Sequence, residues 1–273
     1  MKRSILILLL SFVLLNLYSE DITFVSRSHT DDLKVNLGKL YIQDDYLSTL
    51  RYDGYLFGLS NEWTQLLLRD STKQWWHRGI VGVSVGKFYN TVKSNSIIGV
   101  SGRAAWGSFY NFDTQIKVDG LGFNIGPFIA LDVFAKYHNS NVNKPLSIDF
   151  ASDIEAYANI YYSFAAPRSS YRLGYEFYFG LFGVMFAPEY AESYYEISKG
   201  ELKNTIAFSS LHNKINFLQR LYFEIQFKHS CWTIGIEHKL VRYNHNILYF
   251  SQDYISLNLG TKFNYQTFIK KFK

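Results

Sequence analysis

The chain has 273 residues, with 28 Lys and Arg against 23 Asp and Glu, for a formal net charge of +5. So mild a charge does not indicate a nucleic-acid-binding protein. A mean hydropathy of −0.09 excludes a bundle of membrane helices. Aromatic residues make up 18% of the chain. Low hydropathy with many aromatics is typical of a membrane β-barrel, in which only alternate residues face lipid. A large soluble β-sandwich is the alternative.

The first segment, residues 1–19, has the pattern of a secretory signal peptide. Lys2 and Arg3 precede an apolar run from Ile5 to Leu15, and Ser19 offers a small residue at a cleavage point. We therefore predict export, cleavage near Ser19 and a mature domain at residues 20–273. An uncleaved anchor helix is the alternative. The single cysteine, Cys231, excludes an internal disulfide.

After the signal peptide, stretches with an apolar residue at every second position follow one another, separated by turn sequences such as "HNSNVNKP" (138–145). This period predicts β-strands. We expect about twelve strands, with ten as the alternative, both even numbers that place the two chain ends on one side of a membrane. The predicted strands are 33–42, 52–68, 76–89, 96–111, 118–137, 147–165, 171–187, 193–198, 201–211, 217–229, 232–243 and 254–268.

The stretch at 147–164 shows why lipid is the expected solvent. Its apolar register includes Ile148, Phe150 and Ile160, and its other register includes Asp149 and Asp153. The alternation is longer than the 9 to 11 or so residues that a membrane-spanning strand needs. We therefore predict an all-β fold, an antiparallel transmembrane β-barrel with apolar side chains outward and polar side chains in the lumen.

The segment "GKLYIQDDYLSTLRYDGYLFGLSNEW" (38–63) resembles the start of an uncharacterised family of Bacteroidetes outer-membrane β-barrel proteins. The matching residues are Asp45, Tyr46, Leu47, Ser48, Leu50, Tyr52 and Gly54. The family's Thr is missing between Asp45 and Tyr46, and Thr49 stands in place of its Pro. The resemblance implies a membrane barrel and no known activity. A polar turn flanked by tyrosines and a plug or lip of the pore remain alternative interpretations of the segment.

Charged residues in the polar register of three consecutive strands form a predicted lumen cluster. Carboxylates gathered in one place can select cations or perform acid–base chemistry. The simpler interpretation is an interior in which acids and bases neutralise one another. The predicted members are Asp132, Lys136, Asp149, Asp153, Glu155, Arg172 and Glu176.

No catalytic, metal-binding or cofactor-binding motif stands out. Four histidines and two serines are candidates for a hydrolase, but none lies in a Gly-x-Ser-x-Gly motif or at metal-ligand spacing. His238 falls in the lipid-facing register, so an interfacial position is expected. The candidates are Ser209, Ser210, His212, His229, His238 and His245.

Aromatic residues at strand ends predict interfacial girdles, and we assign Trp75, Trp76, Tyr162 and Tyr171 to them. The sequence thus predicts an integral protein of the bacterial outer membrane that contacts lipid, does not bind nucleic acid and needs no cofactor. A narrow channel with a charged lumen for a small solute is the first functional hypothesis. A non-conducting structural or interaction barrel is the alternative, and an outer-membrane hydrolase is a distant third. The sequence does not predict an oligomeric state.

Overall fold

The computed structural model describes residues 29–46, 48–67, 74–112, 120–138, 145–166, 169–186, 205–227, 230–245 and 248–263. The predicted signal peptide and the predicted strand at 193–198 lie outside these residues.

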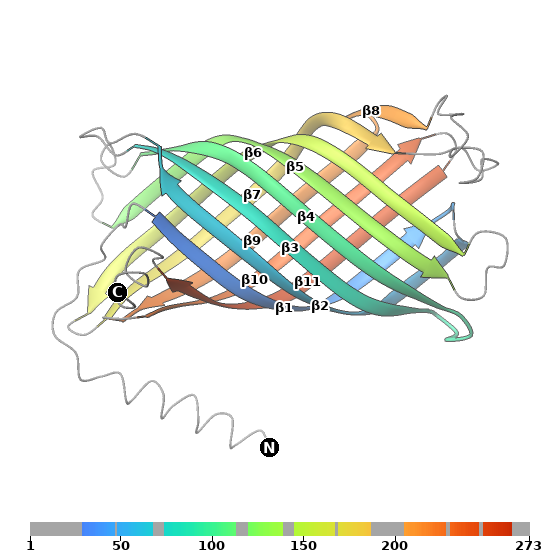
Figure 1. Ribbon diagram of the computed structural model, residues 1–273, viewed down its shortest axis with the longest axis horizontal. Helices are drawn as coiled ribbons and strands as arrows, with labels where there is room; N and C mark the ends of the chain where they lie inside the picture. Colours follow the sequence, from blue (N-terminus) through green and yellow to red (C-terminus); the bar gives the residue numbers. More distant parts are fainter. Residues whose placement is uncertain are drawn as a thin grey trace, which may run out of the picture.

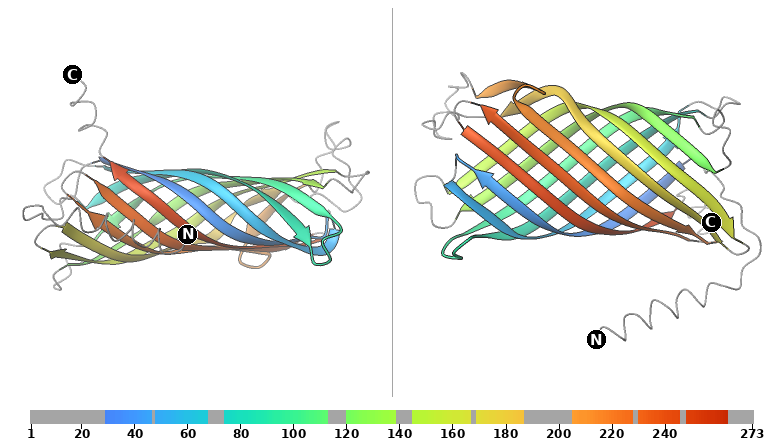
Figure 2. Two further views of the ribbon diagram at one scale, coloured as in Figure 1. Left: turned by 90° about the horizontal axis from the view of Figure 1, so that it is seen from below. Right: turned by 180° about the vertical axis from the view of Figure 1, so that it is seen from behind.

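Within the described residues, eleven strands form one antiparallel sheet that closes on itself (Figure 1). Each strand pairs with its neighbour in sequence from β1 to β7, β11 pairs with β1, and β7 also pairs with β9. Ten strands make the closed wall, which Figure 2 shows from two further directions, and β8 is one extra strand. The ten-strand alternative is therefore the one adopted. The strands are β1 (His29–Asp44), β2 (Ser48–Leu66), β3 (Trp75–Asn90), β4 (Ser96–Asn111), β5 (Leu121–His138), β6 (Leu146–Ala166), β7 (Ser169–Phe186), β8 (Ile206–Ser210), β9 (Lys214–Gln226), β10 (Cys231–His245) and β11 (Leu248–Phe263).

The two faces of the wall follow the alternation of the sequence, because successive side chains of a strand point to opposite sides. In β1, Leu33, Val35 and Leu37 are 49%, 43% and 58% exposed, while Lys34 between them is 2% exposed. The apolar residues thus face outward and the charged residues face inward, the reverse of a soluble protein. This confirms the predicted orientation of the two registers and the barrel fold.

Proline interrupts the wall at one point. Pro127, in the middle of β5, faces outward and lies beside a gap in the β4–β5 ladder, between the pairs Gly107–Phe128 and Tyr110–Ile125. Proline has no backbone N–H to donate, so a break in pairing is expected there.

The extra strand β8 lengthens the wall beside β7. β9 pairs with β7 as far as Phe179, and β8 pairs with it from Phe182 onward, in the same antiparallel sense. A turn at residues 211–213 separates β8 from β9, and Asn213 closes it by donating to the Phe208 carbonyl at 2.9 Å. The predicted strand at 201–211 therefore corresponds to β8.

Candidate functional site: the barrel interior

The predicted lumen residues all lie on β5, β6 and β7 and belong to the inward register. Four of them are almost fully buried: Lys136, Asp153, Glu155 and Glu176 are 0%, 4%, 1% and 1% exposed. They do not form one cluster. Instead, they divide among separate groups of ion pairs, completed by residues from other strands that sequence reasoning did not assign to the site.

The largest group crosses the middle of the barrel, and we call it the central ion network. It consists of Lys34, Glu62, Arg78, Glu176, Arg220 and Glu237, from six different strands.

Arg220 is the hub of the central ion network. Its Nη1 donates to Glu62 Oε1 at 2.6 Å and to Glu176 Oε1 at 2.8 Å, and its Nη2 donates to Glu237 Oε2 at 2.7 Å. Arg78 pairs with both Glu62 and Glu176, the latter at 2.7 Å. Three cations thus neutralise three carboxylates inside the wall, which is the arrangement that makes buried charges tolerable.

A second group joins Asp132 and Glu155, two of the predicted residues. Arg103 bridges them, with distances of 2.8 Å to Asp132 and 2.6 Å to Glu155, and Lys239 pairs with Asp132 at 2.5 Å. Both carboxylates therefore have a cationic partner, which favours the interpretation of a neutralised interior over that of a free acidic filter.

The remaining predicted acids have their own lysines. Asp153 accepts from Lys214 at 2.7 Å and from the Asn216 amide at 2.7 Å. Asp149 pairs with Lys136 at 2.5 Å, and Lys136 also pairs with Asp44, a residue at the end of β1.

Arg172 differs from the other predicted residues. Its Nε donates to Ser163 Oγ at 3.0 Å, and its guanidinium lies 4.3 Å from the centre of the Tyr161 ring. It therefore stacks on an aromatic face at the end of the barrel where β6 ends and β7 begins.

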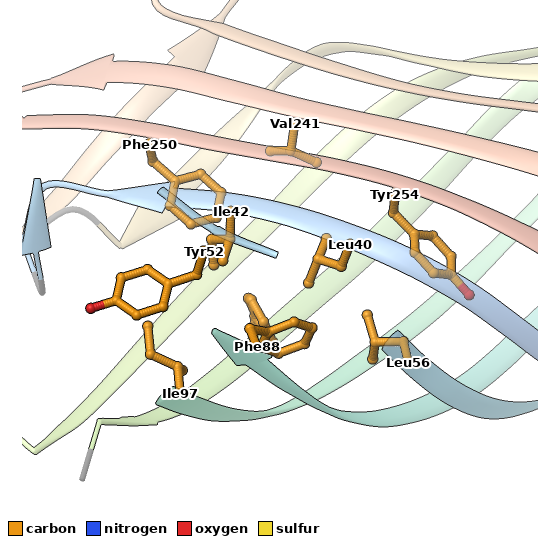
Figure 3. Close-up of a cluster of buried hydrophobic side chains, with 10 residues drawn as sticks. Leu40, Ile42, Tyr52, Leu56, Phe88, Ile97, Val241, Phe250 and Tyr254 are labelled. Atoms are coloured by element: carbon orange, nitrogen blue, oxygen red, sulfur yellow. The ribbon is translucent and has the colours of Figure 1, made fainter. Parts of the chain in front are cut away.

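Apolar side chains also fill the lumen, contrary to the expectation of a lining made only of polar and small residues. Figure 3 shows one such cluster, formed by ten inward residues from seven strands near the β1–β2 turn. Its members are Leu40, Ile42, Tyr52, Leu56, Phe88, Ile97, Phe134, Val241, Phe250 and Tyr254. We call it the apolar plug.

Glycine makes room for the apolar plug at one position. A Cβ at Gly99 of β4 would lie 2.6 Å from the Phe134 ring and 2.8 Å from the Phe88 ring. The two rings, with centroids 6.3 Å apart and nearly perpendicular planes, close over this backbone. A second apolar cluster, around Phe128, Tyr157 and Tyr178, lies on the other side of the Arg103 group.

Two cavities remain between these groups. One, of about 130 Å³, is lined by small and polar residues such as Ser84 and Ser101 and by parts of the apolar plug. The other, of about 200 Å³, is lined by Asn124, Asn159 and charged residues near the strand ends of β9 and β11. Glu62 and Arg220 line both cavities, so the central ion network separates them.

At the second cavity the central ion network continues through Lys34 into further ion pairs, which the sequence analysis missed. Asp32 pairs with Lys34 at 3.2 Å and lies 3.9 Å from Lys262, which also pairs with Glu224. These residues stand in the inward register of β1, β9 and β11, so the alternation of the sequence does predict that they point into the lumen. Their partners come from distant parts of the chain, which the alternation does not reveal.

The predicted girdle residues are divided between the two faces. Trp75 and Tyr162 are 43% and 48% exposed on the outer surface, and Tyr171 lies on the outer face between the rings of Phe164 and Phe223. Trp76 is only 8% exposed and packs in the second apolar cluster of the lumen. Its assignment to the girdle was wrong, because neighbouring residues of a strand face opposite sides.

The candidates for hydrolysis are scattered. Ser209 donates to Asp153 inside the barrel at 3.3 Å, while Ser210 lies 2.5 Å from His212 in the exposed turn after β8. In the described part of the chain no carboxylate is hydrogen-bonded to His212. His238 faces outward, as predicted, and bonds with Gln219 and Asp253. His229 lies outside the described residues, and His245 ends β10.

The described residues contain neither a cluster of metal-binding side chains nor a helix that could span a membrane. No group of three or more His, Cys, Asp or Glu in those ranges could hold a metal ion. No helix there is long and apolar enough to cross a membrane.

Solved structures with a similar arrangement are bacterial barrels of low sequence identity. The transport unit of the autotransporter AIDA-I from Escherichia coli matches with a TM-score of 0.49 and 8% identity, over 91% of this chain and 94% of the other. The outer membrane protease OmpT from Escherichia coli matches with a TM-score of 0.43 and 6% identity, over 89% and 99%. Neisserial surface protein A matches with a TM-score of 0.32 and 13% identity, over 85% and 97%.

A search of curated proteins found no match. A family model described as "Protein of unknown function (DUF3316)" matches residues 5–252. This agrees with the resemblance to an uncharacterised family, while the bacterial group that the resemblance named stays a prediction. Because the match extends over most of its 273 residues, the chain belongs to this family of unknown function, DUF3316.

Proposed function

We propose that the protein is an integral barrel of the bacterial outer membrane that does not conduct and that works through its outer wall and rims. The membrane location is supported by the exposed apolar register and by the closed wall, in which each of the ten strands of the described cylinder has a strand neighbour on both sides. The predicted signal peptide is consistent with export.

The apolar plug is the observation that carries the non-conducting role. Leu40 and Phe88 are fully buried, and Tyr52 and Ile97 are 2% exposed, although all four point into the lumen. An aqueous path for ions would need polar groups along its whole length to replace lost hydration. A layer of packed aliphatic and aromatic side chains does not supply them.

A narrow channel is the second candidate, and the two cavities favour it. They meet at Glu62 and Arg220, so rearrangement of these two side chains would join them. The apolar plug would also have to move before solute could pass.

Single-channel recording in planar bilayers tests the proposal. The purified wild-type protein is expected to be silent under conditions in which a reference porin, reconstituted in parallel, gives steps. Reproducible conductance steps from the wild type would refute the non-conducting role and support the channel.

If conductance steps are observed, two sets of variants test whether the ions pass through this lumen. Conductance that changes with Glu62→Gln would place the ion path through the central ion network. Steps whose cation preference is the same after Asp149, Asp153 and Glu155 are changed to Asn or Gln would exclude these acids as a selectivity filter.

A further inference from the structure

The outer wall is uneven in charge. On β5, β6 and β7, no residue of the outward register is charged within the described parts of these strands. On β10, β11, β1, β2 and β3, the outward charges lie in the half of the wall nearest the β1–β2 turn, except for Asp31 at the start of β1, which pairs with His29. We define the basic patch as Lys39, Arg51, Lys87 and Arg242.

Strand pairing places the basic patch within three adjacent rows. Each row follows one set of opposed residues across the strands. The first row runs Arg242, Ser251, Gln43, Arg51; the second runs Leu240, Asp253, Tyr41, Asp53, Tyr89; the third runs His238, Ile255, Lys39, Tyr55, Lys87.

The next row marks a sharp boundary. It runs Ile236, Leu257, Leu37, Phe57, Val85, and all five side chains are at least 46% exposed. The row after it is Ile234, Leu259, Val35, Leu59, Val83. Along each of these strands the basic patch therefore begins where the lipid-facing apolar surface ends, with Tyr41, Tyr55 and Tyr89 between its cations, as expected at a membrane interface.

The cations of the patch are short of carboxylate partners. Lys39 pairs with Asp53 at 3.1 Å. Arg51 and Lys87 lie over the rings of Tyr41 and Tyr89, at 4.8 and 5.2 Å, and no carboxylate pairs with them or with Arg242 within the described ranges.

The excess of cations in the patch, and their chemical type, favour an anionic partner. Its three rows hold four cations against two carboxylates, Asp53 and Asp253, and Asp253 already accepts from His238 at 3.0 Å. The lumen, by contrast, neutralises its cations with acids. Guanidinium groups bind phosphate oxygens with two parallel hydrogen bonds, and lysines attract phosphate as point charges.

The orientation of the barrel indicates that the basic patch lies in the outer leaflet of the membrane. β1 begins and β11 ends at the opposite end of the barrel from the patch. The widest interval in sequence between consecutive described strands separates Phe186 of β7 from Ile206 of β8, and both of these residues lie at the patch end. Outer-membrane barrels carry their longer loops on the extracellular side.

We propose that the basic patch binds the phosphate groups of a phosphorylated glycolipid of the outer leaflet, of the lipid A type. The apolar rows below the patch accept its acyl chains, and Arg51 and Arg242, at the far edge, reach its phosphates. This inference rests on the proposed membrane location but not on the closed lumen. A conducting wild type would leave lipid binding unchanged, and loss of lipid binding would leave a silent lumen silent.

Titration of the full-length, delipidated protein in detergent, read by native mass spectrometry, tests the proposal. The probes are bisphosphorylated lipid A and the same lipid with both phosphates removed. The wild type is expected to bind the phosphorylated form at least about tenfold more tightly, with the difference shrinking as salt is raised. Equal affinity for the two lipids would overturn the proposal.

Variants locate the site. The variant Lys39→Gln/Arg51→Gln/Lys87→Gln/Arg242→Gln should bind both lipids equally, whereas Arg51→Lys/Arg242→Lys should keep most of the preference. If the fourfold variant does not fold, Asp53→Asn/Asp253→Asn provides the opposite change and should strengthen phosphate-dependent binding. A phosphate preference unaffected by the substitutions tested would refute the assignment to this patch, and displacement by equimolar inorganic phosphate would refute a lipid ligand.

Discussion

Replacing Lys136 by Met should strongly destabilise the barrel. The lysine is fully buried, and its Nζ pairs with Asp149 at 2.5 Å and with Asp44. The rings of Phe134 and Phe250 lie 5.6 and 4.9 Å from the same atom. Removal of the cation leaves two carboxylates facing each other beside aromatic rings. Breaking a buried ion pair in this way costs about 3–5 kcal/mol.

Equilibrium urea unfolding of the protein in lipid vesicles, followed by tryptophan fluorescence, measures this loss. The matched control is Lys136→Met/Asp44→Asn/Asp149→Asn, which removes all three charges and should recover most of the stability, because neutral groups of similar shape bear burial better. A loss below about 1 kcal/mol for the single variant would mean that water enters the site freely and would refute the reasoning. A triple variant that is no more stable than Lys136→Met would also refute the reasoning.

Three further predictions concern the wall and the plug. Ile129→Arg, at the middle of β5 on the outer face, should cost about 2–4 kcal/mol, and Leu146→Arg, at the first residue of β6, about 1 kcal/mol or less; equal costs in vesicle unfolding would argue against a lipid-facing wall. Phe88→Ala, within the apolar plug, should cost about 3–5 kcal/mol in the same assay, and a cost near zero would mean that the plug is loose. A spin label at Ile160 should respond to lipid-soluble oxygen and one at Ser101 to an aqueous relaxant, and the reverse pattern would indicate a soluble sandwich.

Much of the wall could be predicted because the barrel obeys a local rule. In β6 the apolar register of the sequence is the outer face, with Ile160 49% exposed and Asp153 4% exposed. The same rule, applied strictly, would have corrected the one wrong girdle residue, since Trp75 and Trp76 are consecutive and only one of them can face lipid.

The contacts inside the lumen could not be predicted in this way. Asp149 and Glu155 were assigned to one cluster because they stand in the polar register of consecutive strands, which are neighbours in the barrel. The structure gives them different partners, Lys136 and Arg103, and Arg220 meets Glu62 across the barrel. Which inward residues meet depends on strand number and on the stagger of the closed sheet, and neither is encoded in the alternation.

The apolar plug was missed for a related reason. Leu40, Leu56 and Phe88 occupy the inward register of strands whose outward register is also apolar in part. Hydrophobicity on both faces of a strand blurs its alternation, so the pattern identifies the lipid face most clearly where the inner face is charged.

The central ion network has a consequence for how this barrel is assembled. Glu62 enters the growing structure with β2, but Arg220, its partner, follows 158 residues later. In a half-built wall Glu62 can already pair with Lys34 and Arg78 of the neighbouring strands, but the central ion network is completed only when β9 brings Arg220. Closure through such distant pairings is slow, because the entropy of closing long loops is lost before the stabilising contacts form. Partly inserted forms should accordingly be poorly populated, and assembly should approach an all-or-none event.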